Sequence, residues 1–352
     1  MSSGGTAPEG SRAAETAPVR IPATMQAWRV EEITDAGAMV RRRIPVPQPA
    51  ADQYLVRVEA SGLAFGDTLI VRGKYQVKPP LPFTPGSELV GTIVAGDGGP
   101  LAIGTRIASS SRQGGFAEYT VVPRGEAVAL PEGLSAGAAL ALRSNYPTSL
   151  YALREVARLQ PGETLLVHAG AGGVGSAAVA LGRWLGARVI ATAGGVAKGA
   201  ACRAAGADAA VDYKDGDWVA AVKALAPQGV DVVYDPVGGE VGAQSLRCLA
   251  YGARYLVIGF AGGTLTALPA NRLLLHNATA HGVLWGEVRK RDLALAARLT
   301  RDVYDAFGQG RLAVLPGQGY DFARAPEALA ALEGRDSVGK LWLQAGDACE
   351  AR

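Results

Sequence analysis

The sequence predicts an α/β protein that combines a doubly wound parallel sheet with a smaller all-β module. After about residue 148, short apolar runs alternate with segments of helical character. This rhythm is typical of βαβ units, whose helices cover both faces of a parallel sheet. Before that point, apolar and polar residues alternate with period two between frequent Pro and Gly, as they do in a barrel or a sandwich.

The composition limits the class of protein. The 352 residues suffice for two domains, and the shares of 49% apolar and 19% charged residues argue against disorder over most of the chain. The formal charge of +3 is too small to predict nucleic acid or an anionic membrane as the main partner. Cys202, Cys248 and Cys349 stand far apart, which excludes a disulfide scaffold and the usual cysteine-built zinc site. We expect a cytoplasmic protein.

Two segments need a separate interpretation. Residues 1–24 are rich in Gly, Ser, Ala and Pro and contain no apolar run, so they predict a disordered leader rather than a secretory signal. Residues 164–182 carry no Asp, Glu, Lys or Arg but include five glycines. A buried strand followed by a buried helix explains this run better than a membrane span does.

Local patterns predict the individual elements. In the N-terminal module, alternation predicts strands at 54–60, 89–95 and 117–122. Apolar runs predict further strands at 165–169, 188–191, 209–212, 231–235 and 255–258. The intervening segments predict helices at 174–185, 198–205, 218–225 and 243–249. An amphipathic helix at 290–307 and a strand at 339–343 are expected near the end.

A glycine-rich turn is the strongest local signal. Gly170, Gly172 and Gly175 form a G-x-G-x-x-G motif between a predicted strand and a predicted helix. Such glycines permit a tight turn, let a pyrophosphate approach the backbone and let the helix pack close to the strand. The amino end of the helix then offers free N–H groups and a positive dipole end to the anion. The motif therefore predicts a dinucleotide site.

The residues after this turn favour NADPH over NADH. NAD sites place Asp or Glu on the adenosine ribose about 20 residues after the turn, but residues 176–207 contain no acid. Lys198 lies in this stretch and suits a 2′-phosphate. Lys198 by itself would also suit a solvated surface position, so the preference rests on both observations.

Longer motifs carry a resemblance to a known family. The chain contains, in this order, Ser61-Gly-Leu-Ala-Phe-Gly-Asp-Thr-Leu-Ile, Gly73-Lys-Tyr, Pro85-Gly-Ser-Glu, Asn145-Tyr-Pro-Thr, the glycine turn, Gly259-Phe-Ala-Gly-Gly and Asn271-Arg-Leu-Leu-Leu. With these motifs it resembles a medium-chain dehydrogenase/reductase, in particular the zinc-independent quinone oxidoreductase branch with its zeta-crystallin-like enzymes. The resemblance implies a GroES-like β-barrel catalytic domain at 25–147 and 288–352. It implies a Rossmann NADP-binding domain at 148–287 and a cleft between the two.

The resemblance also implies roles for single residues. The expected cofactor residues are Thr148 on the nicotinamide side, Gly172, Gly173 and Val174 along the pyrophosphate, Lys198 and Tyr213 at the 2′-phosphate, and Gly259 and Phe260 behind the nicotinamide ribose. Asn145 is assigned to the substrate pocket. Tyr75 matches a tyrosine that orients substrate or donates a proton, although it would also suit a tyrosine that packs a loop against the barrel.

This chain departs from the family pattern at several positions. Ala64 replaces an asparagine near the nicotinamide, Leu69 a second tyrosine, and Gly194 a serine at the 2′-phosphate. The first two changes predict a less polar substrate pocket. The zinc-using relatives carry Cys and His where this chain has Ala64-Phe-Gly-Asp and Gly86-Ser-Glu. We expect no metal, and a structural role for the histidines at positions 168, 276 and 281.

The resulting hypothesis is hydride transfer from NADPH to a quinone or an α,β-unsaturated carbonyl compound. One alternative is an enoyl-thioester reductase that acts on acyl-CoA or carrier-bound substrates. An alternative of another class is a crystallin-like protein that binds NADPH with little or no catalysis. A homodimer is expected mainly from the resemblance, with a sheet edge near 280–285 as its interface.

Overall fold

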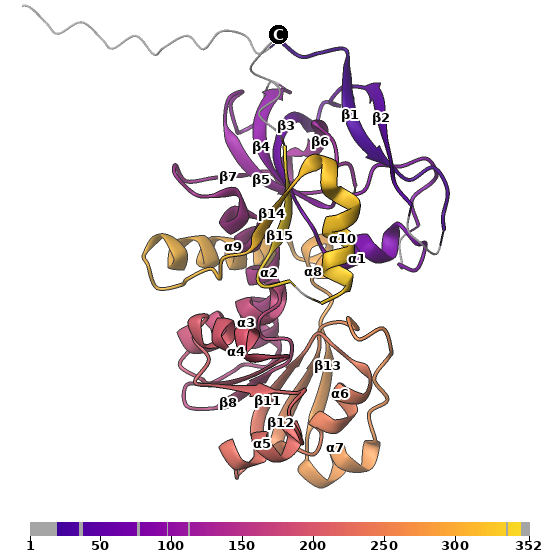
Figure 1. Cartoon of the computed structure of the whole chain (residues 1–352). Coiled ribbons are helices and arrows are strands. Elements are labelled where there is room, and N and C mark those ends of the chain that lie inside the picture. The colour runs from indigo at the N-terminus through magenta and orange to yellow at the C-terminus, as the bar shows by residue number, and fades with distance from the viewer. Residues whose placement is uncertain are drawn as a thin grey trace, which may run out of the picture.

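The computed structural model describes residues 20–34, 38–75, 78–96, 98–111, 113–335 and 337–345. The chain folds into two parts, one above the other in Figure 1. The upper part contains the N-terminal strands together with the C-terminal helix α10 (Ala325–Glu333), and the lower part contains the middle of the chain. Residues 1–19 of the expected leader lie outside the described residues, and its last residue, Thr24, opens the first strand.

The lower part is built on six parallel strands in the spatial order β10-β9-β8-β11-β12-β13. Their bounds are β8 (Thr164–Val167), β9 (Arg188–Ala193), β10 (Ala209–Asp212), β11 (Val230–Asp235), β12 (Leu249–Val257) and β13 (Thr279–Gly282). Counted along the chain, this order is 3-2-1-4-5-6, which is the strand order of dinucleotide-binding sheets. The predicted doubly wound parallel sheet is thereby confirmed.

Helices cover both faces of this sheet. Leu165 and Val167 pack into the cluster that contains helix α3, whereas Leu166 between them packs with α5 and α6 on the opposite face, as the two-residue period of a strand requires. The helices of this part are α3 (Gly173–Trp184), α4 (Val196–Ala204), α5 (Trp218–Leu225), α6 (Gly239–Ser245) and α7 (Ala270–His276). Residues 164–182 thus form strand β8 and most of helix α3. Among the described residues, no helix combines the length and the apolar character needed to cross a bilayer.

Helix α6 begins earlier than the predicted helix at 243–249. The side chain of Asp235 accepts hydrogen bonds from the backbone N–H groups of Val237 and Gly238, at 2.8 and 3.0 Å. Gly238 and Gly239 both have a positive φ, a conformation that glycine adopts without strain. The resulting tight turn starts the helix directly after β11.

The upper part contains a seven-stranded mixed sheet and a separate two-stranded sheet. The larger sheet has the order β14-β15-β3-β4-β5-β7, and β6 also pairs with β3. The strands are β1 (Thr24–Arg29), β2 (Val40–Pro45), β3 (Gln53–Gly62), β4 (Glu88–Ala95), β5 (Arg106–Ser110), β6 (Tyr119–Pro123), β7 (Val128–Ala129), β14 (Gln318–Asp321) and β15 (Leu341–Gln344). The end of the chain returns to this part, since Trp342 of β15 pairs with Gly62 of β3.

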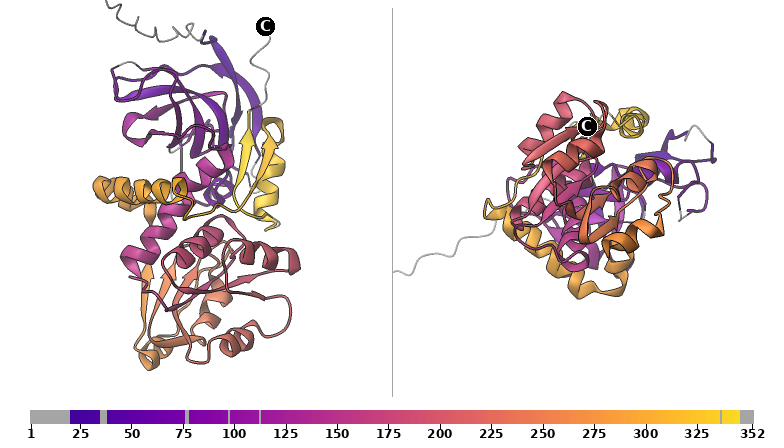
Figure 2. Two further views of the ribbon diagram at one scale, coloured as in Figure 1. Left: turned by 90° about the vertical axis from the view of Figure 1, so that its left-hand side faces the viewer. Right: turned by 90° about the horizontal axis from the view of Figure 1, so that it is seen from below.

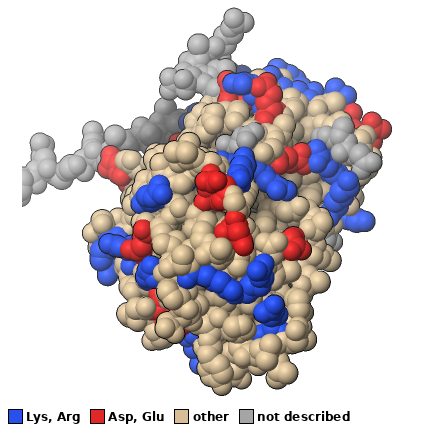
Figure 3. Space-filling view, turned by 60° about the horizontal axis from the view of Figure 1, so that its bottom comes forward, with Lys and Arg blue, Asp and Glu red and all other residues tan. Residues whose placement is uncertain are grey.

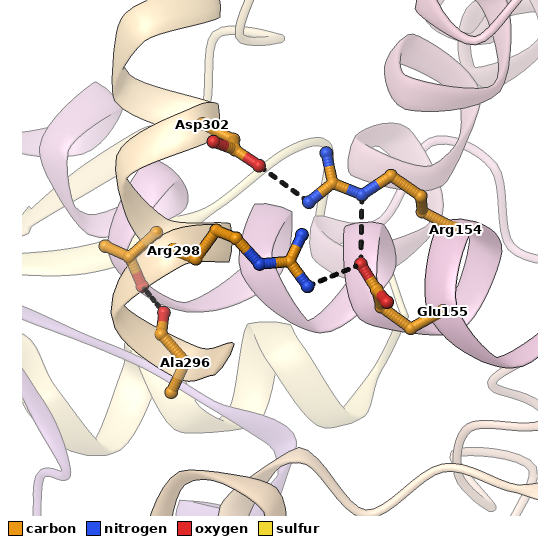
Figure 4. Close-up of polar contacts among 6 residues, drawn as sticks. Arg154, Glu155, Ala296, Arg298 and Asp302 are labelled. Atoms are coloured by element: carbon orange, nitrogen blue, oxygen red, sulfur yellow. Dashed lines mark hydrogen bonds and ion pairs between the residues drawn. The ribbon is translucent and has the colours of Figure 1, made fainter. Parts of the chain in front are cut away.

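Helix α1 (Phe65–Ile70) follows β3, and helix α2 (Ala136–Leu150) connects the two parts (Figure 2). Helix α2 continues into a π-helical stretch, Tyr151–Val156, which an ion-pair network joins to α9 (Leu293–Gly308). In Figure 4, Arg154 pairs with Asp302 at 2.6 Å and with Glu155 at 3.1 Å, and Glu155 pairs with Arg298 at 3.2 Å.

The helix predicted at 290–307 is divided in two. Helix α8 (Trp285–Arg291) ends at Asp292, whose side chain accepts a 2.9 Å hydrogen bond from the N–H of Leu295 and caps α9. Such a side-chain cap satisfies an N–H group that has no partner inside the helix. The chain therefore starts a new helix within an uninterrupted amphipathic pattern.

Candidate functional site

A cavity of about 360 Å³ lies between the two parts, at the carboxyl ends of β8, β9 and β11. Nine of the predicted site residues line it: Ala64, Asn145, Gly172, Gly173, Val174, Gly175, Gly194, Lys198 and Tyr213. A second depression of about 420 Å³ lies along the upper sheet and contains none of the predicted residues. The first cavity is therefore the candidate site, and its place agrees with the rule that ligands bind beyond the carboxyl ends of parallel strands.

The three motif glycines have different surroundings. A Cβ at Gly175 would stand 2.1 Å from the carbonyl oxygen of Ala169, so this position requires the closest approach of helix to strand. A Cβ at Gly170 would meet Ala191 at 2.7 Å and Cys202 at 2.9 Å, in the packing behind the turn. A Cβ at Gly172 would stand 3.3 Å from its nearest neighbour, the carbonyl oxygen of Ala169, and this glycine lines the cavity. Gly172 is thus the glycine at which a pyrophosphate could approach the backbone.

Helix α3 begins at the cavity, next to a side chain from α2. Gly172 is the N-cap of α3, and no side chain caps this end. The amide nitrogen of Asn145 would lie 2.7 Å from a Cβ at Gly173, so Asn145 closely abuts the first residue of the helix. Asn145 is buried and lines the cavity. The free N–H groups of the helix start are therefore available to an anion beside Asn145.

One end of the cavity is basic, and no Asp or Glu is among the residues that line that end. Lys198 and Tyr213 line this end together with Gly194. The Tyr213 hydroxyl lies 2.7 Å from the place of a Cβ at Gly194, so a larger residue at this position would require the Tyr213 side chain to shift. The nearby acid, Asp212, accepts hydrogen bonds from the backbone N–H groups of Lys214 and Gly195, which lower the pKa of its carboxyl. The Asp212 carboxylate, at the end of β10, is therefore occupied by backbone N–H groups, and Asp212 is not among the lining residues of the cavity.

The C-terminal return of the chain supplies a second cation that sequence reasoning missed. Arg335 lines the cavity, and its carbonyl oxygen accepts a hydrogen bond from the Lys198 ammonium. Its guanidinium donates a 3.3 Å hydrogen bond to the carbonyl of Gly262. Four residues later, the N–H of Gly339 donates to the carbonyl of Ala171 at 2.8 Å, inside the glycine turn. No local motif marks Arg335, because only the fold brings it to this turn.

A buried polar wall closes the other end of the cavity. Glu88 accepts a 2.5 Å hydrogen bond from the Ser144 hydroxyl and forms an ion pair with the Lys340 ammonium, and all three residues line the cavity. Asp67 lies close by and accepts a 2.8 Å hydrogen bond from the N–H of Ala64. Burial raises the pKa of Asp67 to about 7, and the charge of Glu88 adds to this shift.

Sequence reasoning missed this wall as well. A signal was present, since Glu88 ends the Pro85-Gly-Ser-Glu motif, but that motif supported the family resemblance and the absence of zinc ligands without predicting a role for Glu88. The less polar substrate pocket stays a prediction: Ala64 lines the cavity, but so do the charged residues Glu88 and Lys340.

Six predicted residues lie outside the described cavity lining, and one of them is Gly170, whose packing behind the turn is described above. The Tyr75 ring lies against Gly66 of α1, 3.3 Å from the place of a Cβ there, and Leu69 lies half-buried on the same helix. The Thr148 hydroxyl donates a 2.8 Å hydrogen bond to the carbonyl of Ser144, one turn earlier in α2. Gly259 and Phe260 precede Ala261, which does line the cavity. The roles of these six residues, like those of the nine that line the cavity, stay predictions.

His168 forms part of the cavity floor and has two hydroxyl partners. Its ring nitrogens lie 2.9 Å from the Thr192 hydroxyl and 2.7 Å from the Ser245 hydroxyl. Complete burial lowers the pKa of His168 to about 4, so the imidazole is neutral at pH 7. Within the described part of the chain, no three His, Cys, Asp or Glu side chains are grouped so that they could hold a metal ion.

Comparisons with known proteins agree with this architecture. Residues 173–301 match the family described as zinc-binding dehydrogenase, and residues 50–132 match the alcohol dehydrogenase GroES-like domain. The second match confirms the expected GroES-like domain. The chain is similar to quinone oxidoreductase-like protein 2 of Rattus norvegicus, with 36% identity over 302 residues, which cover 84% of this chain and 86% of the relative.

Solved structures give the same result. The quinone oxidoreductase of Thermus thermophilus, determined also in complex with NADPH, has a TM-score of 0.80 at 34% identity and covers 91% of this chain and 100% of its own. A mycobacterial protein in complex with NADPH has a TM-score of 0.84 at 31% identity, with 91% of this chain and 99% of that chain covered.

Proposed function

Because the chain belongs to the medium-chain dehydrogenase/reductase superfamily, in its quinone oxidoreductase-like branch, we propose that it is an NADPH-dependent reductase of quinones or α,β-unsaturated carbonyl compounds. One observation carries this proposal. A single cavity contains both groups of residues. One end is lined by the cations Lys198 and Arg335 and by the glycine turn, and the other end is lined by the buried polar wall described above. A dinucleotide needs the first end, and a carbonyl substrate needs the second.

The residues of the first end fit NADPH. The uncapped N-terminus of α3 and the open side of Gly172 suit the pyrophosphate. Lys198, Tyr213 and Arg335 offer two positive charges and a hydroxyl to a 2′-phosphate, and Asp212 is held by backbone N–H groups. This charge pattern suits a phosphate and would give a bare ribose no comparable partner. The reported complexes of two similar proteins with NADPH support the same choice.

The chain's own part in the reaction is to bind, orient and exclude water. When bound, NADPH would supply a hydride from C4 of its nicotinamide. Asn145, buried between α2 and the start of α3, lies where it can orient a group beyond the pyrophosphate. The apolar surroundings from Leu63, Ala64 and Leu341 favour a flat, poorly hydrated acceptor. Negative charge that develops on the acceptor oxygen requires a hydrogen-bond donor at the polar wall.

Two measurements test the proposed function. Titration with NADPH and NADH, followed by protein fluorescence, should show tighter binding of NADPH. Oxidation of NADPH should then be followed by its absorbance with a set of quinones, enones and enoyl thioesters. Binding without oxidation above background by any acceptor would favour the crystallin-like alternative, and a preference for thioesters would favour the enoyl-thioester reductase. Failure to bind either nucleotide would reject all three.

We further propose that the protein is a homodimer that pairs through β13. This strand is the last of the six-stranded sheet, so one of its edges has no neighbour among the described strands. Leu274, Leu275 and Leu284, close to it in sequence, are 80%, 71% and 64% exposed. A second copy would cover both the free edge and these leucines.

A further inference from the structure

The buried wall of the cavity contains the ammonium group of Lys340, which has no role in the proposed binding of the cofactor. Lys340 and Glu88 are 5% and 6% exposed, stand 252 positions apart in the sequence and form an ion pair. A charged pair loses its hydration when it is buried, so a location beside a ligand cavity calls for an explanation. Gly62 provides the necessary space, because a Cβ there would stand 2.8 Å from the Glu88 carboxylate and 2.9 Å from Cε of Lys340.

The hydrogen bonds of the pair leave donors on Lys340. An ammonium group has three N–H donors. Within the part of the chain that the structure describes, Glu88 is the hydrogen-bond partner of the Lys340 side chain. Glu88 uses its other oxygen for the Ser144 hydroxyl, so its position is fixed from two sides. Lys340 is thus held in place with two N–H groups left for a ligand in the cavity.

We propose that Lys340, positioned by Glu88, binds the carbonyl oxygen of the substrate and donates the proton that this oxygen takes up during reduction. The proposal rests on the reductase function proposed above and adds a catalytic residue to it. It also defines the substrate class, since the acceptor must present a carbonyl oxygen to the wall while its electron-poor atom faces the nucleotide.

The proposed step balances in atoms and charge. Addition of a hydride to the acceptor moves an electron pair onto the carbonyl oxygen, which becomes an enolate or a hydroquinone anion. An N–H bond of Lys340 breaks, its electron pair stays on nitrogen, and an O–H bond forms on the substrate. The one proton that the overall reaction consumes is then taken up from solution by the amine, which is again an ammonium paired with Glu88. The Ser144 hydroxyl keeps its hydrogen bond to the Glu88 carboxylate and neither gains nor loses a proton in this step.

This assignment differs from the expected role of Tyr75, whose ring lies against Gly66 of α1, outside the described cavity lining. Tyr75 and Lys340 can be separated experimentally, because loss of the phenol hydroxyl removes no charge from the wall. Tyr75→Phe should therefore leave the binding of an anionic oxygen unchanged.

The first test requires no turnover. We would titrate 4-nitrophenol, a coloured oxyanion probe, in the presence and absence of NADP. The ammonium should lower the pKa of the bound phenol by about one unit or more, which is visible as phenolate absorbance. The variant Lys340→Met/Glu88→Gln, which removes both charges together, should lose this shift. Lys290→Met on exposed α8 should keep it. A phenol whose ionisation is unchanged by the wild-type protein, or is changed equally by the double variant, overturns the proposal.

The second test separates charge from acidity. Lys340→Arg keeps a positive charge beside Glu88 but does not release its proton at neutral pH. It should therefore keep the phenolate shift, while kcat with a quinone or an enone falls by about 100-fold or more. NADPH affinity should stay within about threefold of wild type, because the 2′-phosphate end is untouched. An unchanged kcat in Lys340→Arg would reject the role of proton donor even if the double variant fails to fold.

The two proposals can fail separately. A lysine-dependent phenolate signal without NADPH oxidation by any acceptor would retain the oxyanion site and reject the reductase function. Equal acceptor reduction by wild type and by the double variant would retain the reductase and reject Lys340.

Figure 3 shows that both signs of charge are interspersed on the face turned toward the viewer. That face gives no large field of one sign that would attract an anionic substrate. The charge relevant to the proposal lies inside the cavity, in the Lys340–Glu88 pair.

Discussion

The backbone N–H of Gly339 donates a 2.8 Å hydrogen bond to the carbonyl oxygen of Ala171. The same glycine forms an isolated parallel bridge with Gly172, although 167 positions of the sequence separate the two. The upper part of the molecule thus reaches the glycine turn directly. Arg335 and Lys340, on either side of this contact, enter the cavity because of it.

Gly175→Ala should destabilise the protein. A Cβ at this position would stand 2.1 Å from a backbone oxygen, which cannot move as a side chain can. We expect the free energy of unfolding to fall by about 1–3 kcal/mol, measured by denaturant titration. Gly172→Ala is the matched control, with 3.3 Å to the nearest atom. It should retain stability and lose NADPH affinity. Equal stability of Gly175→Ala and wild type would contradict the close packing.

Lys198→Ala should weaken NADPH binding and leave NADH binding nearly unchanged. Hydrogen bonds to charged groups contribute about 1.5–3 kcal/mol, so we expect a loss of about 10-fold or more in affinity for NADPH only. Fluorescence titration with both nucleotides measures this difference. Lys223→Ala, on the exposed side of α5, is the control. An equal loss for both nucleotides would place Lys198 away from the 2′-phosphate.

His168 should make the protein less stable in mild acid. Its pKa is about 4 in the folded state and about 6.5 in an unfolded chain. Because the unfolded state takes up the proton first, the contribution is complete above pH 6.5 and is lost as the pH falls toward 4. The advantage of wild type over His168→Asn should shrink by about 3 kcal/mol across this window.

The comparison with His168→Asn is needed because Asp67 acts in the opposite direction. Burial raises the pKa of Asp67 to about 7, so acidification stabilises the folded state through this group. Both proteins share that contribution, and it cancels in the difference between them. A difference in unfolding free energy that does not vary between pH 7 and pH 4 would show that His168 is not buried as described.

Leu284→Lys should convert the proposed dimer into a monomer. Leu284 lies two residues after the end of β13 and is 64% exposed in the single chain. A lysine there would have to lose its hydration at the interface. Light scattering after gel filtration gives the mass in solution. Leu293→Lys, a 71% exposed leucine at the start of α9, should keep the mass of wild type. A wild-type monomer would reject the proposed interface.

Local patterns were sufficient to predict the parallel sheet and the turn. Period, glycine spacing and short apolar runs all act over a few residues, and β8, α3 and the motif of Gly170, Gly172 and Gly175 follow from them. The prediction of one helix at 290–307 was partly wrong, because the chain ends one helix and starts another at Asp292. The cap of Asp292 does not disturb the amphipathic period, so the period could not reveal this break.

The polar wall could not be predicted in the same way. Lys340 and Glu88 are 252 positions apart, and neither carries a local signal of its partner. Only the pairing of β15 with β3, together with the space at Gly62, brings them together. The resemblance supplied positions for the nucleotide and none for this pair.

The chain passes between the two parts twice, first through α2 and later through the segment that leads into α8 and α9. Because α2 and α9 pack on one another, the two connections between the parts lie side by side. The hydrogen bond from Gly339 to Ala171 belongs to neither connection, so it ties the upper part to the glycine turn at a third place, and an opening of the cavity there would have to break it.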